Sequence, residues 1–91
     1  MPINIYKDDY DRIDYLCEDI WDLLTQIDSL EAWLKTKGAS LPKDSYVADI
    51  GFDIRKDAVG GGAVLNSESM KIMGKIGMDI YFSEYPESAK E

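Results

Sequence analysis

The sequence predicts a small α+β domain, a two-layer sandwich with elements in the order (β)-α-β-α-β. Two patterns support this prediction. Apolar residues recur every three or four positions from about Asp8 to Lys37, and they alternate with polar residues from Tyr46 to Ile54. A shorter helical segment and a last strand follow. We expect a long acidic first helix and a short second helix to cover one face of a two- or three-stranded sheet.

The first half of the chain is expected to hold a short strand at Ile3–Tyr6 and then the long helix. The apolar stripe of this helix consists of Ile13, Leu16, Ile20, Leu23, Ile27, Leu30 and Leu34. Gly38 is expected to end the helix in the left-handed conformation. A helix of about 30 residues would be about 45 Å long. It is therefore either continuous or broken near Asp28, which has capping-box spacing to Glu31.

The second half is expected to contain a strand, a helix and a last strand. The apolar side of the first strand comprises Tyr46, Ala48, Ile50, Phe52 and Ile54. Asn66 or Ser67 can cap the helix, and Gly77 can end it. The apolar residues of the helix are Met70, Met73 and Ile76. The last strand has Met78, Ile80 and Phe82 on one face and Asp79, Tyr81 and Ser83 on the other, and it ends at Pro86.

From Tyr46 onward the chain resembles the bacterial domain-of-unknown-function family catalogued as number 4279. The strand Tyr46–Ile54, the helix start Leu65–Met70 and the strand Gly77–Phe82 carry the resemblance. They correspond to the C-terminal part of the family's domain, whose N-terminal strands and their tryptophan have no counterpart here. The resemblance implies an α/β fold. It implies no mechanism, because the family has no established activity.

The net charge is -8, and the acidic excess is confined to one part of the chain. Between residues 8 and 31 nine acidic residues are opposed only by Arg12, whereas the remaining nine acids and nine bases balance. An acidic surface repels nucleic acid and anionic membranes, so we expect a basic protein surface as the partner. The 91 residues suit one α/β domain at 1–86 with a flexible tail at 87–91.

Aromatic residues accompany the acids, and rigid rings among carboxylates are typical of hot spots for basic partners. If Ile13 and Leu16 face the core, the outward side of the long helix carries the predicted partner-binding residues, which are Asp11, Asp14, Tyr15, Glu18, Trp21 and Asp22. The alternatives are that this face is polar only for solubility and that Trp21 folds over the edge of the core. Trp33 is expected in the core.

The composition argues against catalysis and against a bound cofactor. Histidine, the most frequent general base and metal ligand, is absent. Cys17 is the only cysteine, so an internal disulfide is excluded, and we expect a core residue in a reducing compartment. Gly60–Gly62 lacks the spacing of a phosphate-binding loop and is expected to be flexible. No apolar run is long enough to span a membrane, and Met1–Asp9 does not resemble a signal peptide, so we expect a cytoplasmic protein.

Three functions from different classes follow. The first is a non-enzymatic binding module, a small acidic inhibitor of the immunity or anti-defence type from a bacterium or phage. It would mask a basic surface of a nuclease, toxin or defence protein, in one version by mimicking nucleic acid. The second is a homo-oligomeric module, for example a homodimer, joined through the heptad seam or a sheet edge. The third is a Mg²⁺-dependent enzyme in which Asp49, Asp53 and Asp79 hold the metal.

Overall fold

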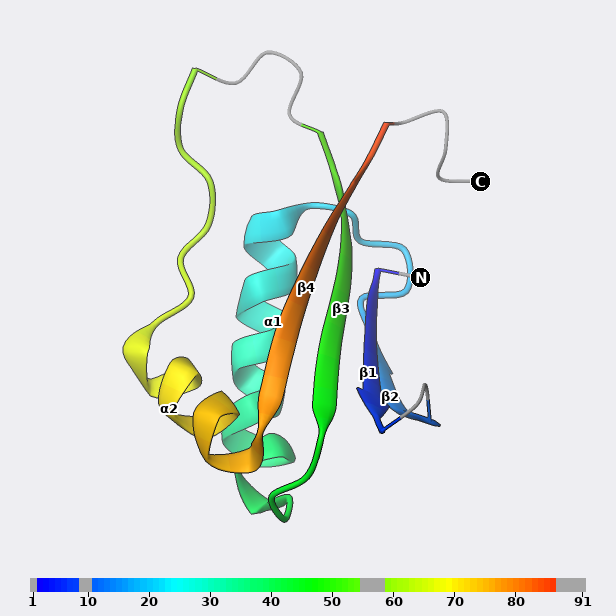
Figure 1. Ribbon diagram of the computed structural model, residues 1–91. Coiled ribbons are helices and arrows are strands. Elements are labelled where there is room, and N and C mark those ends of the chain that lie inside the picture. Colours follow the sequence, from blue (N-terminus) through cyan, green and yellow to red (C-terminus); the bar gives the residue numbers. More distant parts are fainter. Residues whose placement is uncertain (1, 9–10, 55–58, 87–91) are drawn as a thin grey trace.

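A computed structural model describes residues 2–8, 11–54 and 59–86, and it shows four strands and two α-helices (Figure 1). In chain order the elements are β1 (Ile3–Lys7), β2 (Asp11–Leu16), α1 (Leu23–Thr36), the 3-10 turn η1 (Gly38–Ser40), β3 (Tyr46–Asp53), α2 (Ser67–Ile76) and β4 (Met78–Tyr85). The predicted α+β class is confirmed. The predicted tail at 87–91 lies outside the described residues.

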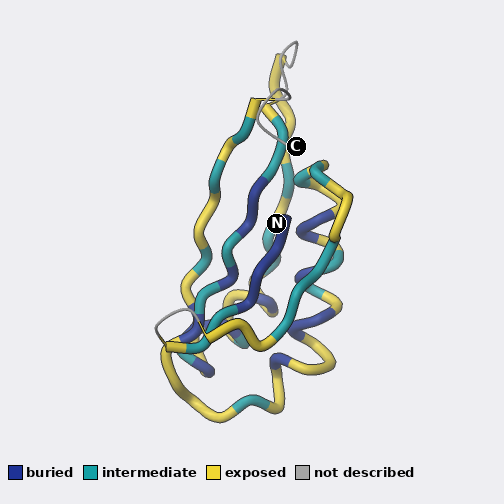
Figure 2. The backbone as a smooth tube through the Cα atoms, turned by 90° about the vertical axis from the view of Figure 1, so that its right-hand side faces the viewer, coloured by how far each residue is buried: buried dark blue, intermediate teal, exposed yellow. Residues whose placement is uncertain are grey.

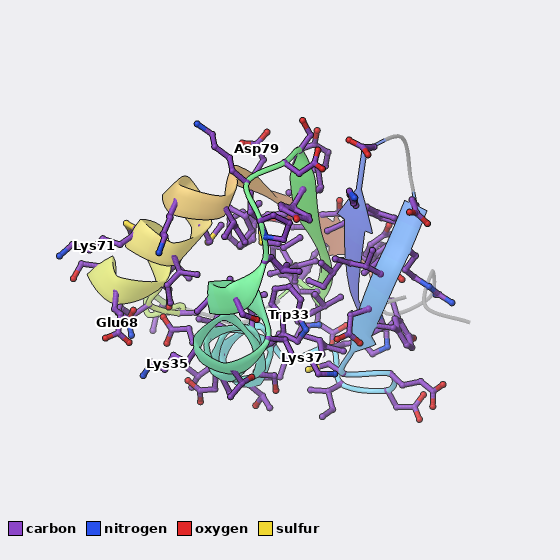
Figure 3. The ribbon with its side chains drawn as sticks, turned by 90° about the horizontal axis from the view of Figure 1, so that it is seen from below. Trp33, Lys35, Lys37, Glu68, Lys71 and Asp79 are labelled. Carbon is purple, nitrogen blue, oxygen red and sulfur yellow. The ribbon has the colours of Figure 1, made fainter. Side chains whose placement is uncertain are left out.

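The strands form one mixed sheet in the order β2-β1-β3-β4. β1 is antiparallel to both neighbours, whereas β3 and β4 run parallel and are joined through α2. Both helices lie on one side of the sheet when it is viewed from below (Figure 3). The expected two or three strands are thus too few, because a fourth strand, β2, forms where the sequence predicted helix.

The core lies between the sheet and α1. Ile3 and Ile5 of β1 and Ala48 and Ile50 of β3 are fully buried, and α1 contributes Ile27, Leu30, Trp33 and Leu34 to the same cluster. Figure 2 shows the buried residues along the middle strands and on the side of α1 that faces them. The prediction that Trp33 belongs to the core is confirmed, since 6% of its surface is exposed.

The prediction of a long helix from Asp8 is wrong, because Asp11–Leu16 pairs with β1 as a strand. Ile5 pairs with Asp14 but Tyr6 pairs with Arg12, so the ladder skips Ile13. This irregularity is a β-bulge, which displaces the alternation of side chains by one residue. Because of the bulge, the apolar residues of β2 do not alternate with a period of two. Their spacing of three residues, from Ile13 to Leu16, is also the spacing of a helical stripe.

α1 begins at Leu23 because Asp22 caps it. The Asp22 carboxylate accepts hydrogen bonds from the Thr25 backbone N–H at 3.0 Å and from the Thr25 hydroxyl at 2.8 Å. No break occurs near Asp28. Instead of closing a capping box there, Glu31 accepts hydrogen bonds from the Asn66 N–H and the Ser69 hydroxyl, both at 2.8 Å. Glu31 therefore ties the beginning of α2 to the middle of α1.

The end of α1 also differs from the prediction. The helix ends at Thr36, and Gly38 continues into η1 without a left-handed conformation. A Cβ atom at Gly38 would lie 3.0 Å from the Trp33 ring and 3.1 Å from the Leu34 side chain. This glycine is thus suited to close packing and not to helix capping.

The predictions for the second half are confirmed in their main features. Asn66 caps α2 by accepting a hydrogen bond from the Ser69 N–H at 2.8 Å, and Gly77 ends the helix with φ of 87°. β4 ends at Tyr85, directly before Pro86. Three apolar positions differ: Met70 is 55% exposed, Phe82 is 51% exposed, and Ile54, which follows the end of β3, is 49% exposed. Gly60–Gly62 lies in the connection between β3 and α2, with positive φ at all three residues.

Candidate partner-binding site

The six predicted partner-binding residues do not share a helix face. Asp11, Asp14 and Tyr15 lie on β2, while Glu18, Trp21 and Asp22 lie in the connection between β2 and α1. Successive residues of a strand point to opposite faces of the sheet, so Asp14 and Tyr15 cannot form one surface. The prediction of an acidic outward face on the first helix is therefore wrong, and the cause is the strand that replaces the first part of that helix.

The Asp14 carboxylate is bound by hydrogen-bond donors of the same chain. Its carboxylate accepts hydrogen bonds from the Trp33 indole N–H at 2.6 Å, the Tyr15 backbone N–H at 2.8 Å and Lys37 Nζ at 3.4 Å. Figure 3 shows Trp33 of α1 and Lys37, which directly follows the helix, on the side of α1 that faces β2. Burial opposes ionisation of this carboxyl, but the hydrogen bonds from Tyr15, Trp33 and Lys37 outweigh it and lower its pKa. The charge of Asp14 is thus compensated by the protein's own donors.

Tyr15 and Arg12 form part of the sheet face that the helices leave open. The Arg12 guanidinium lies 5.2 Å from the centre of the Tyr15 ring, within the range of a cation–π contact. Arg12 also donates a hydrogen bond to the Asn4 side chain at 3.3 Å. The Tyr15 hydroxyl lies 3.5 Å from the Glu18 carbonyl oxygen, to which it donates. Both residues therefore have partners within the chain.

Trp21 packs against the protein's own sheet. Its ring meets the Tyr85 ring edge to face, with centres 5.6 Å apart, and its carbonyl accepts a hydrogen bond from the Asp53 N–H at 2.9 Å. A Cβ atom at Gly51 would lie 2.9 Å from the Tyr85 ring and 3.5 Å from the Trp21 ring. Trp21 thus covers the end of β3. This position resembles the alternative expectation, in which Trp21 folds over the edge of the core.

Gln26 holds this connection in place, and sequence analysis missed it. Its side chain is fully buried, and its amide nitrogen donates to the Ile20 carbonyl at 2.8 Å and to the Gly51 carbonyl at 2.7 Å. It therefore joins the β2–α1 connection and the beginning of α1 to β3. No spacing rule identifies such a residue, because its partners are backbone groups far along the chain. The only sequence signal is an amide next to the apolar stripe.

A cleft of about 390 Å³ opens where β3 and β4 end and α1 begins. Its apolar lining consists of Leu23, Leu24, Phe52 and Ile54. Gly62 borders it, and the three acidic residues in the lining are Asp22, Asp53 and Glu84. Leu24 and Ile54 are 54% and 49% exposed, so apolar surface is open to a ligand. The cleft combines an apolar lining with negative charge.

Acidic residues are concentrated at the end of the molecule where this cleft lies. Here β2 ends, α1 begins, and β3 and β4 end (Figure 1), and the acids described at this end are Glu18, Asp19, Asp22, Asp53 and Glu84. We call these residues the acidic end. The described basic residues lie on other parts of the fold: Lys7, Arg12, Lys35, Lys37, Lys43, Lys71 and Lys75. Arg55 and Lys56 follow Ile54 and lie outside the described residues.

The three aspartates of the metal hypothesis do not converge. Asp49 is opposite Tyr81, Asp53 is opposite Tyr85, and Asp79 is opposite Val47, so each lies in a different row of the sheet. Asp49 and Asp53 are four positions apart on one strand, a distance of about 13 Å. No group of three metal-ligating side chains occurs in the described part of the chain. Burial raises the pKa of Asp49, which disfavours its charged form without any metal.

Cys17 also differs from its predicted setting. It follows β2 directly, outside any helix, with φ of 56°. It is half-buried and packs against the edge of the core cluster, and it is a free cysteine. Its left-handed backbone conformation is uncommon for a residue with a side chain. Cys17 therefore marks the turn at which β2 leaves the sheet.

No helix in the described ranges has the length and apolar character needed to cross a membrane. Comparisons of the chain with family models, curated proteins and solved structures found no match. The resemblance of residues 46–82 to family 4279 therefore stays a sequence-based prediction. The fold and the site define a small α+β domain with a mixed sheet and a cleft at its acidic end.

Proposed function

We propose that this protein is a non-enzymatic binding module whose acidic end covers a basic surface of a partner protein. The cleft carries the proposal, because it places three carboxylates beside exposed apolar side chains. We favour an inhibitor of the immunity or anti-defence type, with a nuclease, toxin or defence protein as its target. The cytoplasm fits a chain whose single cysteine is unpaired.

An arginine or lysine side chain of the partner matches the chemistry of the cleft. Its aliphatic stem can lie on Leu24 and Ile54 while its charged group meets Asp22 and Glu84. Arginine suits the site better than lysine, because its planar guanidinium is weakly hydrated and pairs with carboxylates through two parallel hydrogen bonds. Glu18 and Asp19 are exposed at the same end and add long-range attraction that speeds association.

The first turn of α1 does not turn the cleft into an anion site. A helix N-terminus carries partial positive charge and unpaired N–H groups. Here the Asp22 carboxylate already accepts the Thr25 N–H, so a negative side chain occupies the position that an anion would take. The cleft therefore favours a cation.

Neutralising the acidic end is expected to weaken binding of a synthetic oligo-arginine peptide about tenfold. The variant is Asp19→Asn/Asp22→Asn/Glu84→Gln, in which asparagine keeps the helix cap at position 22. Three charges at the rim of an interface contribute about 0.5 kcal/mol each, which gives this factor. Fluorescence anisotropy at an ionic strength of about 0.1 M measures the change.

The matched control is Asp11→Asn/Asp28→Asn/Asp79→Asn, which removes the same charge from exposed positions outside the acidic end. We expect its affinity to stay within about threefold of the unmodified protein, since exposed charges beyond a Debye length of about 10 Å are screened. Equal losses in the two variants would mean that only net charge matters, and the proposed site would be wrong.

A further inference from the structure

β4 is an edge strand with unpaired backbone groups. Among the described residues it pairs only with β3. The carbonyls of Gly77 and Tyr85 accept hydrogen bonds from Tyr46 and Ile54, so the odd-numbered residues of β4 direct their backbone groups toward β3. The N–H and C=O groups of the even-numbered residues therefore point outward, and these residues are Met78, Ile80, Phe82 and Glu84.

The two edges of the sheet differ in their protection against further pairing. β2, the opposite edge, is short, has a bulge at Ile13 and carries Asp11, Arg12 and Asp14. Bulges, short length and charges are the features by which proteins protect an edge. β4 is eight residues long, pairs with β3 in unbroken register and contains no proline, and its two charged residues, Asp79 and Glu84, lie toward its ends. The β4 edge is thus open to another strand.

Exposed aromatic side chains lie at the middle of β4. Tyr81 and Phe82 are each 51% exposed although they point to opposite faces of the sheet. The Phe82 ring meets the Phe52 ring of β3 edge to face, with centres 6.3 Å apart. Because about half of each side chain is exposed, apolar surface is available on both faces of the sheet beside this edge.

We propose that β4 pairs antiparallel with β4 of a second copy, about a two-fold axis at Tyr81. The sheet would then continue across both copies. In this register Tyr81 lies opposite Tyr81 of the second copy, and Ile80 lies opposite Phe82. Each Ile80–Phe82 pair exchanges the outward backbone hydrogen bonds, while the Tyr81 pair is of the non-hydrogen-bonded kind. Aromatic and branched side chains form the favourable cross-strand pairs of such a ladder.

Side-chain chemistry selects this register. An axis at Phe82 would place Ile80 opposite Glu84, whereas the axis at Tyr81 pairs Ile80 with Phe82 and leaves only Met78, at the end of the ladder, opposite Glu84. An axis at Ile80 would place Glu84 opposite Ile76, which belongs to α2 and not to a strand. With the axis at Tyr81, Asp79 lies opposite Ser83 and no carboxylate lies opposite another.

The charge distribution also suits an antiparallel pair. Both copies have an excess of acid, but the acidic end lies where β4 ends, so the two acidic ends point away from each other (Figure 1). Glu84 of each copy comes opposite Met78 of the other, next to the last turn of α2, which carries Lys75. The two-fold arrangement thus keeps the two acidic ends apart and places each Glu84 near the end of α2 that carries a lysine.

Sedimentation equilibrium between about 10 µM and 1 mM tests the proposal, because a single edge-strand contact is a small interface and gives weak association. We expect the full chain to shift from monomer to dimer over this range, and Phe82→Lys to raise the dissociation constant at least tenfold. The matched control is Ile13→Lys, which adds the same charge to the protected edge and should leave dimerisation unchanged. Circular dichroism verifies that both variants fold.

A chain that stays monomeric up to about 1 mM would overturn the proposal and leave the edge to a strand of another protein. Loss of the dimer in Ile13→Lys but not in Phe82→Lys would also overturn it, because the contact would then involve β2.

Disulfide trapping tests the register in a Cys17→Ser background. Directly opposite, non-hydrogen-bonded residues have Cα atoms about 4.5 Å apart, a distance that a disulfide spans. Tyr81→Cys is therefore expected to form a covalent dimer under mild oxidation. Phe82→Cys should not, since diagonal neighbours are about 7–8 Å apart. A covalent dimer from Phe82→Cys but not from Tyr81→Cys would refute the axis at Tyr81.

Discussion

Gly77→Ala is expected to lower the free energy of unfolding by about 3 kcal/mol or to prevent folding. Gly77 has φ of 87°, a conformation that strains any residue with a Cβ atom. A Cβ atom there would also collide with the backbone carbonyl oxygen of Asp44. This segment cannot move away easily, because the Asp44 N–H donates to Ile76 and the Tyr46 N–H donates to Gly77. Urea denaturation measures the loss.

Gly74→Ala is the matched control within the same helix. Gly74 lies inside α2, and a Cβ atom there would have nothing within 4 Å. Alanine favours the helix over glycine by about 0.5–1 kcal/mol, so this variant is expected to gain stability by that amount. Both substitutions could instead change the free energy of unfolding in the same direction and by the same amount. The close approach of Gly77 to Asp44 would then not be what stabilises the junction of α2 and β4.

Gln26→Leu is expected to lower the free energy of unfolding by about 3 kcal/mol. Leucine has a similar volume, so the loss reports the hydrogen bonds and not a cavity. The substitution leaves the carbonyls of Ile20 and Gly51 without the buried amide that donates to them. Each unsatisfied buried acceptor costs about 1–3 kcal/mol. We also expect faster hydrogen exchange in residues 17–22, because Gln26 holds this connection against β3.

Thr36→Val serves as the control for Gln26→Leu. The Thr36 hydroxyl donates to the carbonyls of Ala32 and Trp33, but the residue is exposed at the end of α1. Water can replace these hydrogen bonds, so a change within about 0.5 kcal/mol is expected. A comparable loss in both variants would contradict the role given to Gln26.

Sequence patterns predicted the second half of the fold because its signals are unbroken. β3 alternates between buried and half-buried residues from Tyr46 to Ile50, Asn66 and Gly77 have the chemistry of helix caps, and Pro86 follows β4. Local propensity and tertiary structure agree at these positions, so reading the sequence was sufficient.

The first half could not be predicted in the same way. The bulge at Ile13 breaks the alternation of β2, and pairing with β1 overrides a spacing that suits a helix equally well. Asp22 followed by Thr25 marked the true start of α1, but the apparent stripe upstream concealed it. Residue spacing alone does not reveal pairing between strands.

The candidate site was predicted in its charge but not in its location. The acidic excess follows from composition, and Asp22 does line the cleft. Asp53 and Glu84 join it from β3 and β4, which lie far along the chain, while Asp14 turned out to be compensated by Trp33 and Lys37. Such gathering of distant carboxylates depends on the order and direction of the strands.

Mapping the binding surface by NMR tests the central claim most directly. Amide spectra of the labelled chain would be recorded during titration with the oligo-arginine peptide at low salt. We expect the largest shift changes at residues 22–24 and 52–54 and at Glu84, around the cleft. Largest changes at β1, β2 or α2, or changes spread evenly over the acidic residues, would contradict the claim that the acidic end is the docking surface.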